Sequence, residues 1–319
     1  MDHERFIRSF DGTEIFVSTS GDGAVPLVLC DGLGCDGFIW RHLKPYFEPR
    51  YRIVRWHYRG HGLSKIPANL DNLTVDAIRD DLVAVLDALA IDRAVVFGHS
   101  MGCQIILDFA ATHPSRVLGV VPICGSYGRP LETFHDNSLL SAAFPFMQEA
   151  AVRWPRTADR IWRAAVTSEL TRAVARLFET NSRLVRQSDL GPYFQHLAGM
   201  DPRVFARVAT SANDHTVEER LGDVRAPVLI IAGERDGFTP VWLSRRMHTL
   251  TPGSELMVVP GGTHVAPLEI PELLHLRVER FLEERVLPTV GGGTQPAPAP
   301  ASAAPAPKPQ AARRRRQGT

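Results

Sequence analysis

The segment from Gly98 to Gly102, which reads Gly-His-Ser-Met-Gly, constrains the fold of this chain more than any other. The residues before it, Arg93 to Phe97, form a short apolar run rich in β-branched side chains, and Met101 to Ala111 after it has apolar residues at helical spacing. Gly-x-Ser-x-Gly therefore lies where a strand turns sharply into a helix. Because the glycines lack Cβ, strand and helix can pass close together and hold Ser100 on a strained turn with its hydroxyl exposed. We predict a nucleophilic serine; the alternative is a small residue that merely fits a tight loop.

Several other apolar runs are short enough to be strands buried on both faces, and helical patterns separate most of them. The expected strands are Pro26 to Cys30, Tyr51 to Trp56, Val117 to Cys124, Pro227 to Ala232 and Glu255 to Val259. The expected helices are Trp40 to Phe47, Ile78 to Ala90, Pro240 to His248 and Glu272 to Glu284. An N-terminal hairpin is expected from Phe6 to Phe10 and Glu14 to Thr19. This alternation predicts an α/β fold with a mostly parallel, doubly wound sheet.

The alternation of strands and helices is interrupted by a segment of about 100 residues that has no convincing buried strand. We expect a core formed by residues 1–125 and 224–289, and a helical lid over residues 126–223, with helical patterns from Arg160 onward and from Leu170 to Arg186. Aromatic residues are scattered through the lid. We predict that Trp154, Trp162 and Phe178 contact substrate, although such residues can also form the small core of the lid itself.

The C-terminal segment, residues 290–319, has a different composition from the rest of the chain. It contains a Gly-Gly-Gly run, Pro-Ala repeats, Lys308 and Arg313 to Arg316, and no acidic residue. Such a segment cannot bury enough apolar surface to offset the entropy of ordering, so we predict a disordered tail. The tail carries a charge of +5 against a net charge of +1, which leaves the rest of the chain at −4. A mildly acidic core gives no reason to expect a nucleic-acid surface.

The remaining composition is that of an ordinary globular enzyme, with 44% hydrophobic and 22% charged residues. We expect no membrane span, because no apolar run approaches the roughly 18 residues that a span requires. Met1 to Arg5 leads into a charged, strand-like segment without the apolar core of a signal peptide, so we expect a cytoplasmic protein. The four cysteines, Cys30, Cys35, Cys103 and Cys124, show no metal-binding spacing, so we predict buried thiols and no metal. The oligomeric state stays open.

With these elements in place, roughly residues 4 to 287 resemble the α/β-hydrolase superfamily, in particular its lidded serine hydrolases and esterases. In that family an acid follows the next-to-last strand and a histidine follows the last one. Asp236, in Gly233-Glu234-Arg235-Asp236, matches the acid, and His264 matches the histidine. The order Ser100, Asp236, His264 is the family order. The alternative acid is Glu234.

The resemblance also implies the role of each residue. A neutral imidazole accepts the serine proton during attack, and the carboxylate fixes the imidazole tautomer and stabilises the imidazolium. The family builds its oxyanion hole from two backbone N–H groups. The matching positions here are Met101, directly after the serine, and Leu33, in the loop Asp31-Gly32-Leu33-Gly34-Cys35.

Two positions depart from the family pattern. Asp31 stands where a histidine usually precedes the glycine, and His57 stands where relatives commonly have an aspartate. Both residues should end neighbouring strands. We therefore expect either a swapped Asp–His pair that holds the oxyanion loop, or two independent substitutions. Without the pair, the charge of Asp31 would oppose the negative charge that develops nearby.

The nucleophile type narrows the expected reaction. Relatives that open epoxides or displace halide use an aspartate, so Ser100 favours acyl transfer through an acyl-enzyme. We expect a serine hydrolase that cleaves an ester, thioester or lactone of a small, largely apolar substrate without a cofactor. The same residues could instead serve a C–C bond hydrolase or an acyltransferase. A third possibility is a ligand-binding protein of the same fold with little turnover.

Overall fold

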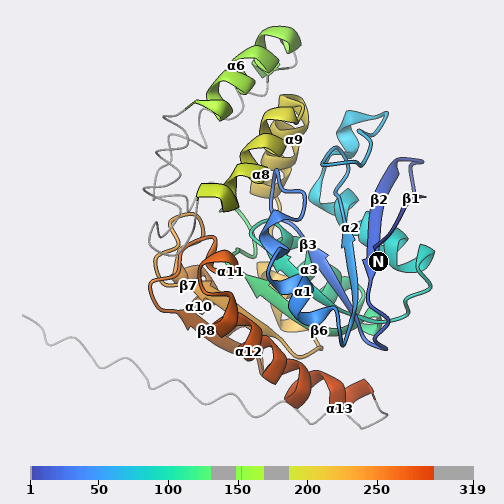
Figure 1. Ribbon diagram of the computed structural model, residues 1–319, viewed down its shortest axis with the longest axis vertical. Helices are drawn as coiled ribbons and strands as arrows, with labels where there is room; N and C mark the ends of the chain where they lie inside the picture. The colour runs from blue at the N-terminus through green and yellow to red at the C-terminus, as the bar shows by residue number, and fades with distance from the viewer. Residues whose placement is uncertain (1, 131–148, 152, 169–186, 291–319) are drawn as a thin grey trace, which may run out of the picture.

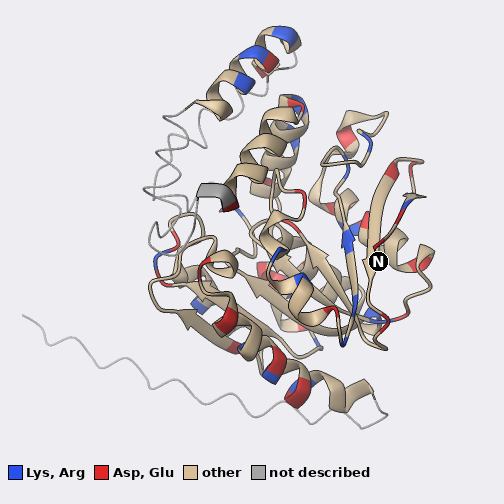
Figure 2. Ribbon diagram, in the orientation of Figure 1, with Lys and Arg blue, Asp and Glu red and all other residues tan. Residues whose placement is uncertain are grey.

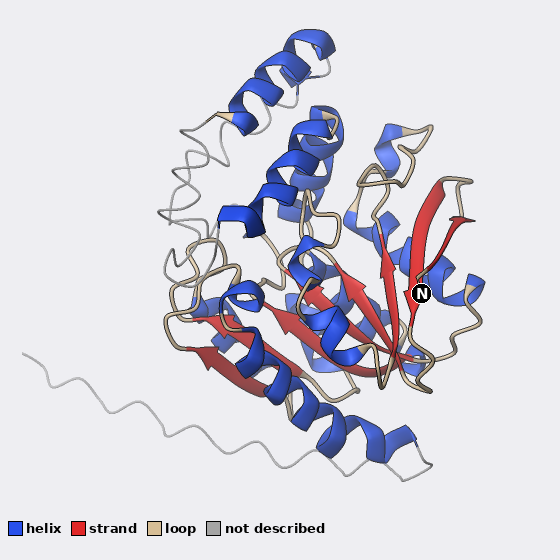
Figure 3. Cartoon of the chain, in the orientation of Figure 1, coloured by secondary structure: helices blue, strands red, loops and turns tan. Residues whose placement is uncertain are grey.

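The computed structural model describes residues 2–130, 149–151, 153–168 and 187–290. Its centre is an eight-stranded sheet in the order β1-β2-β4-β3-β5-β6-β7-β8 (Figure 3). Only the N-terminal hairpin is antiparallel to its neighbours, and the strands from β4 to β8 run parallel. The strands are β1 (His3–Arg8), β2 (Glu14–Ser20), β3 (Pro26–Cys30), β4 (Arg52–Trp56), β5 (Ala94–His99), β6 (Val117–Ile123), β7 (Leu229–Gly233) and β8 (Glu255–Val259). The predicted doubly wound sheet is confirmed.

Helices cover both faces of this sheet (Figure 1). On β3, Leu27 and Leu29 pack with one apolar cluster, whereas Val28 and Cys30 pack with the other. The first cluster includes residues of α1 (Leu43–Phe47) and α12 (Pro271–Phe281). The second includes residues of α2 (Val75–Ala88), α3 (Gly102–Thr112) and α10 (Val241–Leu250). Since neighbouring side chains on a strand point to opposite faces, this division explains why the central strands read as unbroken apolar runs.

Three element boundaries differ from the sequence prediction. The first strand ends at Arg8, so Phe10 lies beyond it and is exposed, with the Arg59 guanidinium over its ring. The predicted helix from Trp40 is two shorter pieces, the 3₁₀ turn η1 (Phe38–Trp40) and α1. The last helix does not end near Glu284, because a π-helical segment, Leu282–Val286, continues α12 into α13 (Leu287–Val290). Leu282 and Val286 are buried, so packing extends this helix.

The outer surface of the C-terminal helix is charged. Figure 2 shows acidic and basic residues interspersed along α12. Arg280 pairs with Glu284 at 2.9 Å, and Arg285 reaches Glu255 on the edge strand β8 at 2.7 Å. Across the described residues, no helix combines the length and the apolar character needed to cross a bilayer.

The described part of the inserted segment is helical (Figure 1). It comprises α6 (Pro155–Thr167), α8 (Gln187–Gly199), α9 (Pro202–Asp214) and the 3₁₀ segment η5 (Glu218–Asp223). A single antiparallel bridge between Gly128 and Thr216 joins the start of the insertion to its end. The predicted helix from Leu170 to Arg186 and the predicted substrate contact Phe178 lie outside the described residues, as do residues 291–319 of the tail.

One buried ion pair joins three parts of the core. Arg59, in the loop after β4, is fully buried and donates to both carboxylate oxygens of Asp81 on α2, at 2.8 and 2.6 Å. Its third nitrogen reaches Asp11 in the hairpin turn at 2.9 Å. A buried guanidinium needs this compensation, because its transfer out of water is costly.

We predict that Asp81→Ala lowers the free energy of unfolding by about 3–5 kcal/mol, since it leaves the Arg59 charge buried and partly uncompensated. The matched control is Asp80→Ala, which removes a neighbouring, 44% exposed carboxylate from Arg79. That exposed pair should contribute about 0–1 kcal/mol. Urea unfolding followed by circular dichroism measures both, and equal effects would contradict the assignment.

Candidate active site

Ser100 lies on the tight turn between β5 and α3, in a left-handed conformation with φ of 54°. This conformation is strained for a residue with a side chain. The neighbouring glycines permit it. A Cβ at Gly98 would lie 2.5 Å from the carbonyl oxygen of Gly102, and a Cβ at Gly102 would lie 2.3 Å from the carbonyl oxygen of Cys30. The motif therefore has the strand–turn–helix context that the sequence predicts.

Asp236 and His264 form a hydrogen-bonded pair across the loops that follow β7 and β8. His264 Nδ1 lies 3.0 and 3.1 Å from the two carboxylate oxygens of Asp236. The carboxylate also accepts hydrogen bonds from the backbone N–H of Phe238 at 2.9 Å and from the N–H and hydroxyl of Thr239, both at 2.8 Å. These donors fix the orientation of the carboxylate, which in turn sets the orientation of the imidazole.

The environment keeps Asp236 ionised. Burial of its side chain by itself raises the pKa of Asp236, but the attraction of His264 and the hydrogen bonds from His264 and Thr239 outweigh burial. The pKa of Asp236 therefore lies below its usual value. Glu234, the alternative acid, is exposed and accepts the backbone N–H of Gly261 at 2.8 Å. Thus the structure brings His264 to Asp236.

The loop that carries His264 is attached to the serine turn through His99. His99 Nε2 lies 2.9 Å from the backbone carbonyl of His264, so this nitrogen carries the proton and donates it. The two rings are 5.0 Å apart. Burial lowers the pKa of His99 to about 3, so the imidazole is neutral. The sequence places His99 in the turn but gives no signal for this contact, because the residues it joins are far apart in the chain.

Leu33 and Met101, the predicted oxyanion donors, lie on segments that meet at Ser100. A Cβ at Gly32 would lie 3.1 Å from Ser100 Cβ, so the loop after β3 touches the serine. Met101 is the N-cap of α3, where the helix dipole favours negative charge. Within the part of the chain that the structure describes, neither the Leu33 N–H nor the Met101 N–H donates to a protein acceptor.

The expected pair of Asp31 and His57 does not form. The two residues follow the neighbouring strands β3 and β4, as predicted, but no hydrogen bond joins these two described residues. Asp31 Oδ1 accepts the indole N–H of Trp40 at 2.6 Å. His57 Nδ1 accepts the backbone N–H of Leu63 at 3.0 Å. Each side chain accepts a hydrogen bond from a residue that follows it closely in the chain, and the pattern of strands does not predict these bonds.

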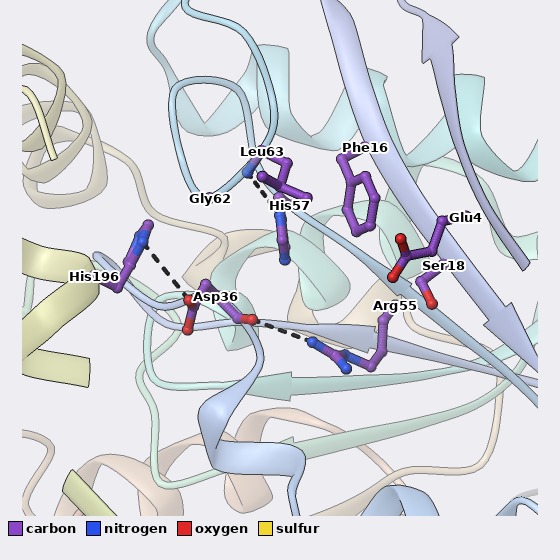
Figure 4. Close-up of a pocket in the computed structure, with 9 residues that line it drawn as sticks. All are labelled: Glu4, Phe16, Ser18, Asp36, Arg55, His57, Gly62, Leu63 and His196. Atoms are coloured by element: carbon purple, nitrogen blue, oxygen red, sulfur yellow. Dashed lines mark hydrogen bonds and ion pairs between the residues drawn. The ribbon is translucent and has the colours of Figure 1, made fainter. Parts of the chain in front are cut away.

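His57 instead faces a separate polar cavity of about 410 Å³ on the hairpin side of the oxyanion loop (Figure 4). In Figure 4 its ring points toward Asp36 and Arg55, and His196 of α8 approaches Asp36 from the other side. The residues that line it are Glu4, Phe16, Ser18, Asp36, Arg55, His57, Gly62, Leu63 and His196. Because Nδ1 of His57 accepts a hydrogen bond, its Nε2 carries the proton and cannot bind a metal as the neutral imidazole.

One group of residues has metal-ligand character by type. Ligand atoms of Asp76, Asp108 and His215 lie within 4.8 Å of one another. However, Arg79 binds both carboxylates, at 2.8 and 2.7 Å, and Arg220 binds Asp108 at 2.7 Å. Two guanidinium groups already supply the positive charge, so this cluster is an ion-pair network.

The two described lid tryptophans have different surroundings. Trp162 packs against Phe205, with ring centroids 4.7 Å apart, and donates its indole N–H to the Leu197 carbonyl at 2.8 Å. Leu197 in turn approaches Gly34 of the oxyanion loop, where a Cβ would lie 2.7 Å from it. Trp154 is 57% exposed, and the Arg153 guanidinium lies over its ring.

Comparison with known proteins places this fold and site in a family. A family model for the alpha/beta hydrolase fold matches residues 25–271. RutD of Caulobacter sp. (strain K31), whose name provisionally assigns it to carbamate hydrolysis, is 27% identical over 80% of this chain and 90% of its own length. The 3-oxoadipate enol-lactonase 1 of Acinetobacter baylyi (strain ATCC 33305 / BD413 / ADP1) is 23% identical over 85% of this chain and 93% of its own.

Solved structures agree with this placement. A thermophilic esterase from Thermogutta terrifontis superposes with a TM-score of 0.73 at 19% identity, covering 88% of this chain and 98% of the esterase. Likeness at this identity shows the shared fold, whereas the match of the family model to most of the chain shows the membership. The chain belongs to the α/β-hydrolase fold family, and it is a hydrolase.

Proposed function

We propose that this chain is a serine hydrolase that cleaves an ester, thioester or lactone of a small, largely apolar substrate through an acyl-enzyme. The observation that carries the proposal is the Asp236–His264 pair, attached through His99 to the turn that holds Ser100. The similarity to a 3-oxoadipate enol-lactonase supports a carbonyl substrate with an oxygen leaving group. The reaction uses water and no cofactor.

In the first half-reaction, the Ser100 hydroxyl attacks the substrate carbonyl carbon. The Asp236 carboxylate accepts a hydrogen bond from His264 Nδ1–H, which keeps the proton on Nδ1 and leaves Nε2 free to take the serine proton. Because the pKa of Asp236 is held low, the carboxylate stays charged and stabilises the imidazolium that forms. His264 then returns the proton to the leaving oxygen or sulfur, and Ser100 keeps the acyl group.

In the second half-reaction, His264 removes a proton from the water that attacks the acyl-enzyme carbonyl carbon. When the tetrahedral intermediate collapses, His264 returns this proton to the Ser100 oxygen, and the acid is released. Both steps pass through a tetrahedral oxyanion. The free N–H groups of Leu33 and Met101 are the donors for it, and one such donor typically contributes about 3 kcal/mol to the stability of the transition state.

The first prediction concerns the nucleophile and separates an enzyme from a ligand-binding protein. Ser100→Ala should abolish both turnover and covalent labelling by a fluorophosphonate, because the attacking oxygen is gone. Ser115→Ala, which changes an exposed serine on the turn before β6, should leave both intact. Circular dichroism checks that each variant is folded. Labelling that survives in folded Ser100→Ala would remove the nucleophile assignment.

The second prediction concerns the acid. Asp236→Asn should lower kcat by about 10⁴-fold, because an amide cannot hold the same tautomer of His264. Glu234→Gln changes a carboxylate of the same loop that binds only a backbone N–H among its described contacts, and kcat should change little. Steady-state kinetics on a chromogenic ester measure both, and a larger loss for Glu234→Gln would reverse the assignment.

The third prediction concerns the lid, which we propose selects the substrate. Trp162 reaches the oxyanion loop through Leu197, whereas Trp154 is mostly exposed. Trp162→Ala should therefore change the relative kcat/KM across esters of increasing acyl length, and Trp154→Ala should change it less. Unchanged ratios in both variants would place the acyl pocket outside the reach of these residues.

A further inference from the structure

Asp31 is a buried carboxylate fixed at both its side chain and its backbone. It is 3% exposed, and Oδ1 accepts the indole N–H of Trp40, which is 1% exposed, at 2.6 Å. The Asp31 carbonyl accepts the hydroxyl of Tyr58, in the loop after β4, at 2.7 Å. Trp40 holds the side chain of Asp31 and Tyr58 holds its backbone, which limits how the chain can continue after β3.

The continuation of that chain is the oxyanion loop. A Cβ at Gly32 would lie 3.1 Å from Ser100 Cβ and 3.3 Å from His99 Nδ1, so the residue after Asp31 already touches the serine turn. Consecutive Cα atoms are about 3.8 Å apart, so Leu33 lies two short steps from the fixed carboxylate. A Cβ at Gly102 would lie 2.7 Å from the Asp31 carbonyl oxygen, so the loop cannot move toward α3.

We propose that Asp31 is a positioning residue, which holds the Leu33 N–H in place through its hydrogen bond to Trp40. The inference rests on the proposed serine hydrolase function. Asp31 does not touch substrate, and it acts through the loop that it precedes.

The protonation state of Asp31 matters because its carboxyl group lies beside the loop that carries the Leu33 N–H. The charged and titratable groups around Asp31 lie on four segments. They are Arg55 on β4, Cys30 on β3, Asp36 and Cys35 on the same loop as Asp31, and Tyr58 on the loop after β4. Burial raises the pKa of Asp31 to about 7; Arg55 and the Trp40 bond act against this rise, and Asp36 adds to it. The carboxyl is therefore neutral below that pH and negative above it. Little water screens a buried anion beside the oxyanion loop, so it opposes the second negative charge that forms in the transition state.

The test compares kcat and KM of three variants between pH 6 and 9. The wild type should lose kcat as the pH rises through about 7. Asp31→Asn keeps the size of the side chain and an oxygen for Trp40 but cannot ionise, so it should keep kcat at pH 6 within about threefold and lose the alkaline fall. Asp31→Ala removes the hydrogen bond and should lower kcat at pH 6, where the wild-type carboxyl is neutral, by about 10-fold or more, with KM little changed.

Two controls separate the hydrogen bond from general effects. Trp40→Phe removes the donor to Asp31 and should lower kcat as Asp31→Ala does. Trp56→Phe is the matched change at an equally buried tryptophan, whose indole donates to no carboxylate among the described residues, and it should retain kcat. Asp36→Asn removes a nearby charge but leaves the hydrogen bond, so the alkaline fall should persist and begin at a lower pH.

An alkaline fall that persists in Asp31→Asn, or wild-type kcat in folded Asp31→Ala, would overturn the proposal. Fluorophosphonate labelling at pH 6 keeps it distinct from the proposed function. Asp31→Asn should still be labelled and Ser100→Ala should not, whereas a wild-type protein that takes no label would contradict the serine hydrolase function itself. If Asp31→Ala does not fold, the pH profile of Asp31→Asn decides the question.

Discussion

The close approach of β5, α3 and the end of β3 is the constraint on which the rest of the site depends. Gly98 and Gly102 let three backbones meet where any side chain would collide with a carbonyl oxygen. Ser100 takes a positive φ as a result, and the sheet and two helical layers that surround the turn oppose its relaxation. A serine held in this way needs little further ordering before it reacts.

The rest of the constellation attaches to this turn from distant parts of the chain. The loop after β8 is joined to the serine turn by the hydrogen bond from His99 to the His264 carbonyl. The loop after β7 is joined to the loop after β8 by the hydrogen bond between Asp236 and His264. The loop after β3 approaches from the other side through Gly32. The parallel strands place all of these loops at one edge of the sheet, which is where open α/β sheets bind their ligands.

Much of this arrangement could be predicted from the sequence, because apolar runs, helical spacing and the glycines of the serine turn are local sequence patterns. The unbroken run of β3 and the strand–turn–helix pattern around Ser100 predict the sheet and the serine turn, and both are present. The chain order of Asp236 and His264 predicts that they pair, and they do. The partners of Asp31 and His57 could not be predicted, because each finds its donor through the path of a loop. The contact between His99 and His264 joins residues far apart in the sequence, so no local spacing of residues predicts it. The last helix runs past Glu284 because buried Leu282 and Val286 favour its continuation, and no capping residue ends it where the pattern weakens.

Two contacts hold the loop from Asp31 to Cys35, which is the predicted oxyanion loop. The predicted lid contacts this loop through Leu197 at Gly34, and the core contacts it through Trp40 at Asp31. In the proposed mechanism both contacts act on the geometry of the loop, and Ser100, Asp236 and His264 carry out the chemistry.

The most direct test of this account is intact-protein and peptide mass spectrometry after a rapid acid quench with a chromogenic ester. An acyl-enzyme on Ser100 predicts one added acyl mass per chain, located on the peptide that contains Ser100, and its loss as turnover is completed. An acyl group on another residue, or turnover of the ester by the folded Ser100→Ala variant, would contradict the central claim.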